Sequence, residues 1–287
     1  MNPLGIYEKA LPRNSSWLEK LKIAKSFNFD FIEISIDETD ERLSRLDWNM
    51  KQKEEIIHNI LQTGVKIPSM CFSGHRRFPL GSTDKEIRKH SLNLMQKAID
   101  FASDLGIRVI QITGYDVYYE EKSVLTRHYF IENLKKCLEM AAQKQIVLAI
   151  EIMDDPFINS ITKYNRINNN FDSPWLQVYP DIGNLSAWPD NDIGYELESG
   201  ISQIIGVHLK DTLAVTENFS GQFKNVPFGE GCVDFLGCLN ILKSNNYHGP
   251  FLIEMWSEQS KHPEQEIKRA LSYLLPKLEE AGYVYKG

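Results

Sequence analysis

The stretch VLAIEIMD, residues 147–154, places a carboxylate inside a short apolar run. A short run of this kind, with β-branched members, is typical of a strand that is buried on both faces. A charge inside such a strand is costly unless it is paired or bound to a metal ion. Glu151 therefore predicts a buried partner elsewhere in the chain.

Short apolar runs alternate with helical periodicity on both sides of this stretch, from one end of the chain to the other. We expect strands at residues 4–7, 31–36, 66–73, 108–113, 147–153, 176–182, 204–209 and 251–256. Helices are expected between and after them, at residues 17–27, 49–63, 83–105, 123–144, 158–170, 193–203, 235–244 and from 263 onward. The segment 83–86 reads as a capping box, and residues 210–233 read as a long loop.

Eight strand–helix units in 287 residues predict a closed (β/α)8 TIM barrel, with the helices outside a parallel sheet. A doubly wound open sheet is the alternative. No shift in composition marks a linker, so residues 1–287 are expected to form a single domain.

Composition excludes several classes of protein. The net charge of −7 argues against a nucleic-acid partner, which would need a basic face. No apolar run approaches the roughly 20 residues of a membrane helix, and the first residues lack the apolar core of a signal peptide. The four cysteines form no CxxC pair. We interpret them as reduced thiols in a cytoplasmic protein.

Three later apolar runs end, like the run at Glu151, in a side chain that can bind a metal or move a proton: Asp181, His208 and Glu254. The steps from Glu151 to Asp181 and on to His208, 30 and 27 residues, each match about one strand–helix unit. Four successive strands would thus deliver one such group each to the C-terminal rim, where barrel active sites lie. Three carboxylates and one imidazole suit one divalent ion, such as Mn²⁺, Zn²⁺, Co²⁺ or Mg²⁺.

Each of these residues also has a plainer interpretation. A single carboxylate at a strand end is commonly a salt-bridged or capping residue, and a lone histidine can simply be hydrogen-bonded to backbone. Four such groups in phase on successive strands favour the metal site.

The pattern also suggests a reaction. A metal ion that binds a carbonyl oxygen and a neighbouring hydroxyl acidifies the C–H bond between them. Two carboxylates on opposite sides of that carbon, here Glu151 and Glu254, can remove a proton from one face and return one to the other, through an enediolate. That arrangement supports epimerisation, whereas two transfers on one face would support isomerisation.

Basic residues near the same rim are candidates for binding an anionic substrate group. His75, Arg76 and Arg77 follow the third expected strand, Lys210 ends the seventh, and Lys224 lies in the loop after it. Arginine binds phosphate bidentately. The alternative is that the two arginines pair with acids such as those at positions 84 and 86. The glycines of the short motif 229–231 are weaker candidates for a phosphate site.

The chain resembles the L-ribulose-5-phosphate 3-epimerase (L-xylulose-5-phosphate 3-epimerase) family of xylose-isomerase-like TIM barrels. The stretches that carry this resemblance are PLGIYEKALP (3–12), DETD (37–40), RLSRLDW (42–48), HRRFPLGS (75–82), GYDVYY (114–119), EIMD (151–154), YPDIGNLSAW (179–188), KNVPFGEG (224–231) and LIEMWSE (252–258). The resemblance implies interconversion of L-xylulose 5-phosphate and L-ribulose 5-phosphate, in L-ascorbate or related pentose catabolism. The family's metal ligands fall on Glu151, Asp181, His208 and Glu254, and its two proton-transfer glutamates on Glu151 and Glu254.

The chain departs from the related free-ketose 3-epimerases at two positions. Phe157 stands where they carry a glutamate, and Asn184 where they carry a histidine. The resemblance implies a different hold on the end of the substrate, which fits a phosphate, and a homodimer as the oligomeric state. A hexulose-6-phosphate isomerase of the same family, a metal-dependent nuclease like endonuclease IV, and a non-catalytic sugar-phosphate sensor are the alternative functions.

Overall fold

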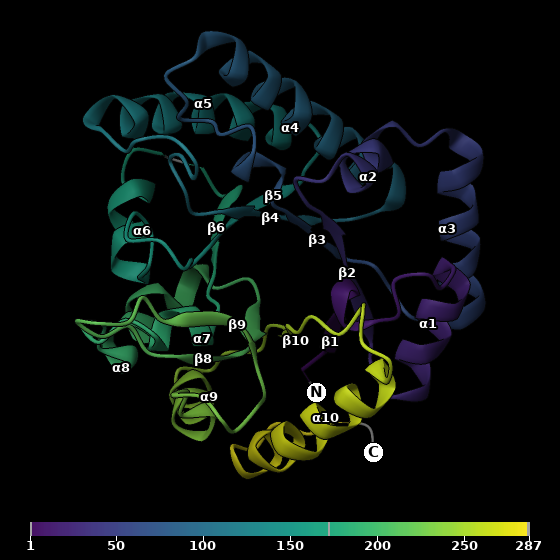
Figure 1. Cartoon of the computed structure of the whole chain (residues 1–287). Coiled ribbons are helices and arrows are strands. Elements are labelled where there is room, and N and C mark those ends of the chain that lie inside the picture. Colours follow the sequence, from purple (N-terminus) through teal and green to yellow (C-terminus); the bar gives the residue numbers. More distant parts are fainter. Residues whose placement is uncertain (1, 172, 286–287) are drawn as a thin grey trace.

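The computed structural model describes residues 2–171 and 173–285, and its centre is a ring of eight parallel strands (Figure 1). The strands are β1 (Leu4–Tyr7), β2 (Phe31–Ile36), β3 (Ser69–Phe72), β4 (Val109–Thr113), β5 (Val147–Glu151), β6 (Leu176–Tyr179), β7 (Val207–Leu209) and β10 (Phe251–Ile253). They are ordered β6-β5-β4-β3-β2-β1-β10-β7. Two isolated parallel bridges, Val178 to Ile204 and Asp181 to His208, link β6 to the β7 side. The sheet is therefore a nearly closed barrel.

Helices surround this ring (Figure 1). The main ones are α1 (Trp17–Ser26), α3 (Met50–Thr63), α4 (Lys85–Leu105), α5 (Val124–Gln143), α6 (Ile161–Asn168), α8 (Ile193–Gly200), α9 (Phe235–Ser244) and α10 (Pro263–Glu280). Short helices α2 (Asp40–Leu43) and α7 (Ile182–Ser186) follow β2 and β6. The apolar helix faces and the strands form one large buried cluster, which explains why the strands read as continuous apolar runs. The TIM-barrel prediction is confirmed.

Strand register brings the ends of successive strands to one level. Thr113 on β4 is paired with Glu151 on β5, which is paired with Tyr179 on β6, and His208 on β7 is paired with Leu252 on β10. Side chains at the C-terminal ends of β5, β6, β7 and β10 therefore meet at one rim of the barrel.

Several predicted boundaries were wrong for local reasons. The third strand is shorter than expected, and the sixth ends at Tyr179 because Pro180 has no N–H for the sheet. The helix cap near residue 83 is Asp84, whose side chain accepts a hydrogen bond from the Glu86 N–H at 2.7 Å. The predicted capping box from Thr83 is therefore incorrect.

The expected long loop after the seventh strand contains an antiparallel hairpin, β8 (Asp211–Leu213) and β9 (Gln222–Val226). The buried carboxylate of Asp211 accepts hydrogen bonds from the Gly229 and Gly231 N–H groups at 2.8 and 3.0 Å. A Cβ on Gly231 would lie 2.0 Å from Oδ1 of Asp211, so only glycine fits there. These glycines hold the loop onto Asp211, and their N–H groups are not free to bind a phosphate as the sequence had suggested.

A buried ion cluster fastens the first loops of the barrel together. Glu8 is fully buried after β1, and its carboxylate accepts two hydrogen bonds from Arg45, at 2.7 and 2.9 Å. It also pairs with Lys20 of α1 at 3.1 Å and with Arg42 of α2 at 3.0 Å. One carboxylate thereby links the end of β1 to α1, to α2 and to the 3-10 turn Ser44–Asp47 that contains Arg45.

Within the described residues, no helix is both long and apolar enough to cross a membrane.

Candidate metal centre and active site

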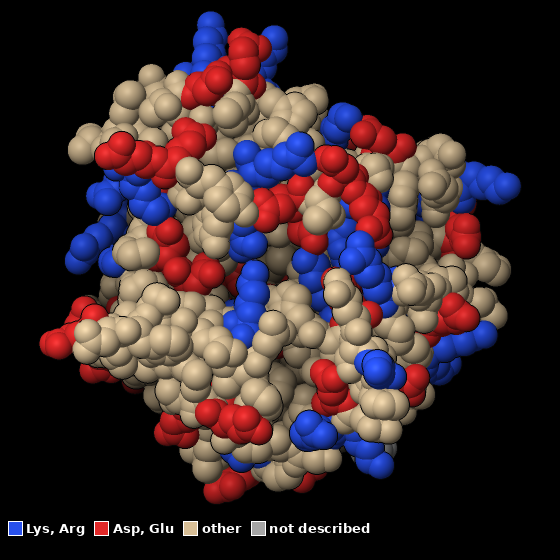
Figure 2. All heavy atoms as spheres, viewed as in Figure 1, with Lys and Arg blue, Asp and Glu red and all other residues tan. Residues whose placement is uncertain are grey.

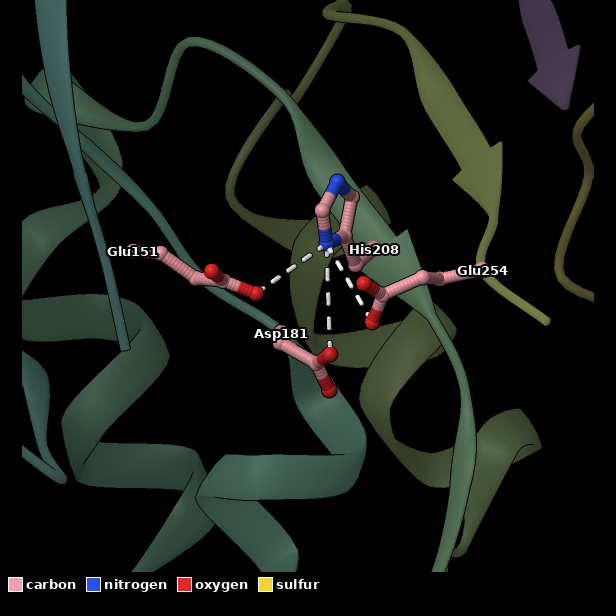
Figure 3. A group of neighbouring side chains, drawn as sticks. All are labelled: Glu151, Asp181, His208 and Glu254. Carbon is pink, nitrogen blue, oxygen red and sulfur yellow. Dashed lines mark ion pairs between the residues drawn. The ribbon is translucent and has the colours of Figure 1, made fainter. Parts of the chain in front are cut away.

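Four side chains from the C-terminal rim converge on one point (Figure 3). Glu151 is the last residue of β5, Asp181 follows β6 and caps α7, His208 is the middle residue of β7, and Glu254 follows β10. Each offers one ligand atom, and these atoms all lie within 4.8 Å of one another. Nδ1 of His208 lies 3.4 Å from Glu151, 3.9 Å from Asp181 and 3.7 Å from Glu254.

The donor set fits a divalent cation. His208 Nδ1, Asp181 Oδ2 and Glu254 Oε2 are buried, and their ion-pair contacts are with Lys210 and within the set of four ligands. Buried polar atoms are normally satisfied by hydrogen bonds, so ligand atoms that face one another and share a single ammonium indicate a site for a further cation. Carboxylate oxygens and an imidazole nitrogen are ligands that Mn²⁺, Zn²⁺ and Co²⁺ accept. The residues present can therefore hold one metal ion.

The charges at this point support the same conclusion. Burial raises the pKa of Asp181 to about 8, despite the attraction of the Lys210 ammonium. Burial also raises the pKa of Glu151, and the hydrogen bond to His208 opposes this only in part. At Glu254 the attraction of Lys210 and then of His208 outweighs burial and lowers the pKa to about 2. Three carboxyl groups meet here, and only Lys210 and His208 can offset their negative charge. A divalent cation would relieve the excess.

A pocket opens above these four residues, and the structure decides which basic residues reach it. Arg76, Lys210 and Lys224 line the pocket. Lys210 is the most buried of the three, with Nζ 2.6 Å from Asp181 and 3.1 Å from Glu254. Both acidic and basic side chains surround the hollow at the centre of this face (Figure 2).

Arg76 is held in place by aromatic and polar neighbours. Its Nη2 donates to the Tyr115 hydroxyl at 3.1 Å, and that hydroxyl donates to Asp154 at 2.8 Å. The guanidinium lies 4.7 Å from the centre of the Tyr118 ring. Its Nε is buried without a hydrogen-bond partner, so the guanidinium retains donor capacity. Lys224 extends from β9 over the ring of Trp256, with Nζ 5.4 Å from the ring centre.

Two predicted anion-binding residues do not reach the pocket. His75 is buried against Phe72, with Nε2 3.3 Å from the Ser91 carbonyl oxygen, and burial lowers its pKa to about 4. Arg77 pairs with Asp40 at 2.7 Å on the outer surface. His75, Arg76 and Arg77 point in different directions because the side chains of consecutive residues in the 3-10 turn of residues 74–76 diverge. The prediction for His75 and Arg77 is corrected, and neither arginine pairs with the acids at 84 or 86.

The sequence analysis missed several residues next to the ligands. Glu33, in the middle of β2, is fully buried, and its Oε1 lies 3.1 Å from His208 Nε2. The signal was available, since Glu33 interrupts the apolar run 31–36 in the same way that Glu151 interrupts its own. Tyr7, Cys71 and Thr113, which line the pocket beside the ligands, were also not identified.

The comparisons with known proteins agree with this geometry. Residues 21–277 match the model of a family described as xylose isomerase-like TIM barrel. The chain belongs to this family. It is also similar to the L-ribulose-5-phosphate 3-epimerase UlaE of Escherichia coli (strain ATCC 8739), with 54% identity over 98% of this chain and 97% of the relative. Relatedness at this level, over almost the whole chain, confirms the predicted resemblance.

Solved structures show the same fold at low sequence identity. A structure of L-ribulose 3-epimerase superposes with a TM-score of 0.77 at 17% identity and covers 98% of this chain and 96% of that one. A xylose isomerase-like TIM barrel protein from Mycobacterium smegmatis in complex with magnesium gives a TM-score of 0.70 at 16% identity, covering 98% of both chains. These matches support the barrel fold alone.

Proposed function

We propose that this protein is an L-ribulose-5-phosphate 3-epimerase that interconverts L-ribulose 5-phosphate and L-xylulose 5-phosphate. The observation that carries the proposal is the meeting of two strand-end glutamates at one buried ligand set, in a chain 54% identical to UlaE. Its substrate is a ketose phosphate. The activity is an isomerase activity of the epimerase class, and it needs one divalent ion.

Glu151, Asp181, His208 and Glu254 would hold this ion. When bound, the ion supplies Lewis-acid polarisation of the substrate carbonyl, which acidifies the neighbouring C–H bond. Glu151 and Glu254 are the proposed proton-transfer residues. Around the barrel, β6 and β7 separate their strands on one side, and β4 to β1 on the other. Their carboxylates thus approach from different directions, as removal of a proton from one face of C3 and delivery to the other requires.

Lys210 is the third proposed participant at this point. Its ammonium contacts Asp181 and Glu254, and it also lines the pocket. A cation in that position stabilises negative charge that develops on a substrate oxygen during proton abstraction.

The reaction can be tested directly with deuterium. We expect the protein, loaded with Mn²⁺ and given L-ribulose 5-phosphate in D₂O, to form L-xylulose 5-phosphate that carries deuterium at C3, detected by NMR. A panel of pentulose and hexulose phosphates decides the chain length of the substrate. Label at C1 in place of C3 would indicate an aldose–ketose isomerase instead. Binding of every ketose phosphate without any exchange would contradict the proposal.

Removing the metal is expected to abolish turnover. Dialysis against a chelator should lower kcat by more than about 100-fold, and Mn²⁺, Co²⁺, Zn²⁺ or Mg²⁺ should be tested for recovery. The ion should also raise the melting temperature, because ligands that bind only the folded state stabilise it. Full activity after chelation, with metal content verified by elemental analysis, would contradict the metal site.

We further propose that Arg76 and Lys224 bind the substrate phosphate. Both line the pocket, and the unbonded Nε of Arg76 leaves a donor available. Partial burial, and then the nearby charge of Arg76, lower the pKa of Lys224. Two cations that repel each other across a pocket are stabilised by an anion between them.

Replacing Arg76 by methionine tests the phosphate site against a matched control. A hydrogen bond to a charged group contributes about 1.5–3 kcal/mol, so KM for the ketose phosphate should rise by about 10- to 100-fold. The rate with the unphosphorylated ketose should change little. Arg77→Met removes the adjacent guanidinium, which faces Asp40 outside the pocket, and should leave KM within about twofold. Equal effects of both variants would contradict the assignment.

The remaining expectations concern assembly and location. We propose a homodimer, which size-exclusion chromatography with light scattering would test. We also propose the cytoplasm as the location. Within the described residues all four cysteines are free thiols, Cys71, Cys137, Cys232 and Cys238, which fits a reducing compartment.

A further inference from the structure

The carboxylate of Glu33 has no role in the reaction described above, yet it is fully buried inside the barrel. Its Oε1 lies 3.1 Å from Nε2 of His208, across the ring from β2 to β7. Its Oε2 has no hydrogen-bond partner. A buried carboxylate with a single polar contact is costly to maintain, which indicates that this contact has a function.

We infer that Glu33 is a positioning residue for the metal centre, which fixes the ring of His208 through its Nε2–H. The inference rests on the metal ligand set of the proposed function. An imidazole that donates one N–H to a carboxylate presents the lone pair of its other nitrogen in a defined direction. Here that other nitrogen is Nδ1, which faces Glu151, Asp181 and Glu254 at 3.4 to 3.9 Å.

Alternative partners for the ring are few within the described residues. The Tyr179 ring packs beside the imidazole, with 4.6 Å between ring centres. A ring contact of this kind does not determine which nitrogen of the imidazole faces the metal ligands. The ammonium of Lys210 contacts Asp181 and Glu254 on the other side of the ligand set. Glu33 is therefore the group that selects which ring nitrogen points at the ligand set.

The first test is metal affinity, measured without substrate. Metal-free protein is titrated with Zn²⁺ or Mn²⁺ in competition with a chromogenic chelator. Loss of such a carboxylate typically weakens metal binding by 10- to 100-fold, and we expect a loss in that range for Glu33→Leu. Glu33→Gln keeps an acceptor oxygen without the charge and should lose less. It also keeps the test decisive if the leucine variant does not fold.

Ser35→Ala is the matched control. Ser35 lies two residues along β2, is fully buried, and donates or accepts at 2.9 Å with the Tyr7 hydroxyl rather than with His208. Its metal affinity should stay within about threefold of the parent. Equal weakening in Glu33→Leu and Ser35→Ala would show general loosening of the barrel and overturn the inference, as would an unchanged affinity in Glu33→Leu.

A second readout follows the ring itself. In the Zn²⁺-loaded parent, the Nε2 proton of His208 should give a downfield NMR signal that exchanges slowly with water, because it is buried and hydrogen-bonded to a carboxylate. Glu33→Leu should shift this signal upfield and speed its exchange. If the parent itself binds no divalent ion, the proposed metal centre fails as well. If the parent binds normally and the variants match it, only the role of Glu33 fails.

Discussion

Replacing Glu254 by glutamine is expected to lower kcat for epimerisation by about 10³-fold, because a general acid–base group contributes about 10²- to 10⁴-fold. Glutamine keeps an oxygen at the ligand position but cannot accept the proton. Residual metal content should be measured alongside the rate, since Glu254 is also a proposed ligand. Activity near that of the parent on every ketose phosphate tried would contradict the two-carboxylate mechanism.

Isotope exchange distinguishes the two glutamates. In the Glu254→Gln protein, Glu151 remains, so one of the two epimers should still exchange its C3 proton in D₂O without conversion. Glu151→Gln should show the complementary behaviour, with exchange of the other epimer. Glu258→Gln is the control, because Glu258 lies four residues farther along, pairs with Arg42 and does not line the pocket. It should retain both exchange and epimerisation, whereas exchange of both epimers by a single-glutamate variant would show that one base serves both faces.

Replacing Glu8 by glutamine or alanine is expected to lower the free energy of unfolding by about 3–5 kcal/mol, the cost of removing one partner from a buried ion pair. Glu8 is fully buried, and its loss leaves the charges of Lys20, Arg42 and Arg45 without their shared partner. Urea denaturation monitored by circular dichroism measures the effect. Glu41→Gln, which removes an exposed acid paired with Arg13, should cost no more than about 1 kcal/mol.

The Glu8 cluster also predicts a pH dependence of stability. Although burial opposes it, the attraction of Arg45 and then of Lys20 lowers the pKa of Glu8 far below its usual range. The pKa of a glutamate in the unfolded chain is about 4.3. The stabilisation is therefore fully present above that value and is lost as the pH falls below it toward the folded pKa. Between pH 7 and pH 3 the parent should lose more stability than Glu8→Gln; equal losses would assign the acid sensitivity to other carboxylates.

The sequence was sufficient for the barrel and for the ligand set because both depend on short, regular patterns. Apolar runs alternating with helical stripes determine a parallel sheet, and residues at strand ends are placed by the sheet itself. The sequence alone therefore predicts that Glu151, Asp181, His208 and Glu254 lie together, as the structure shows. Glu33 could have been found by the same argument, since a buried charge in a strand predicts a partner wherever it occurs.

The directions of side chains in the loops do not follow such a pattern. Arg76 faces the pocket while Arg77 faces Asp40, and this difference depends on contacts with Tyr115 and Tyr118, which lie about 40 positions farther along the chain. The motif at residues 229–231 was interpreted as an anion site, but its N–H groups bind Asp211 instead. The direction of a loop side chain is set by neighbours distant in sequence, and only the tertiary structure supplies them.

Local patterns in the sequence were enough to predict the parallel barrel and the four groups at its rim, because strand periodicity fixes the positions of residues along a regular sheet. Only the folded chain shows which cations line the pocket, how β8 and β9 bring Lys224 to it, and that Glu33 meets His208 across the ring. These features depend on packing between segments up to 175 residues apart, which local sequence patterns do not encode.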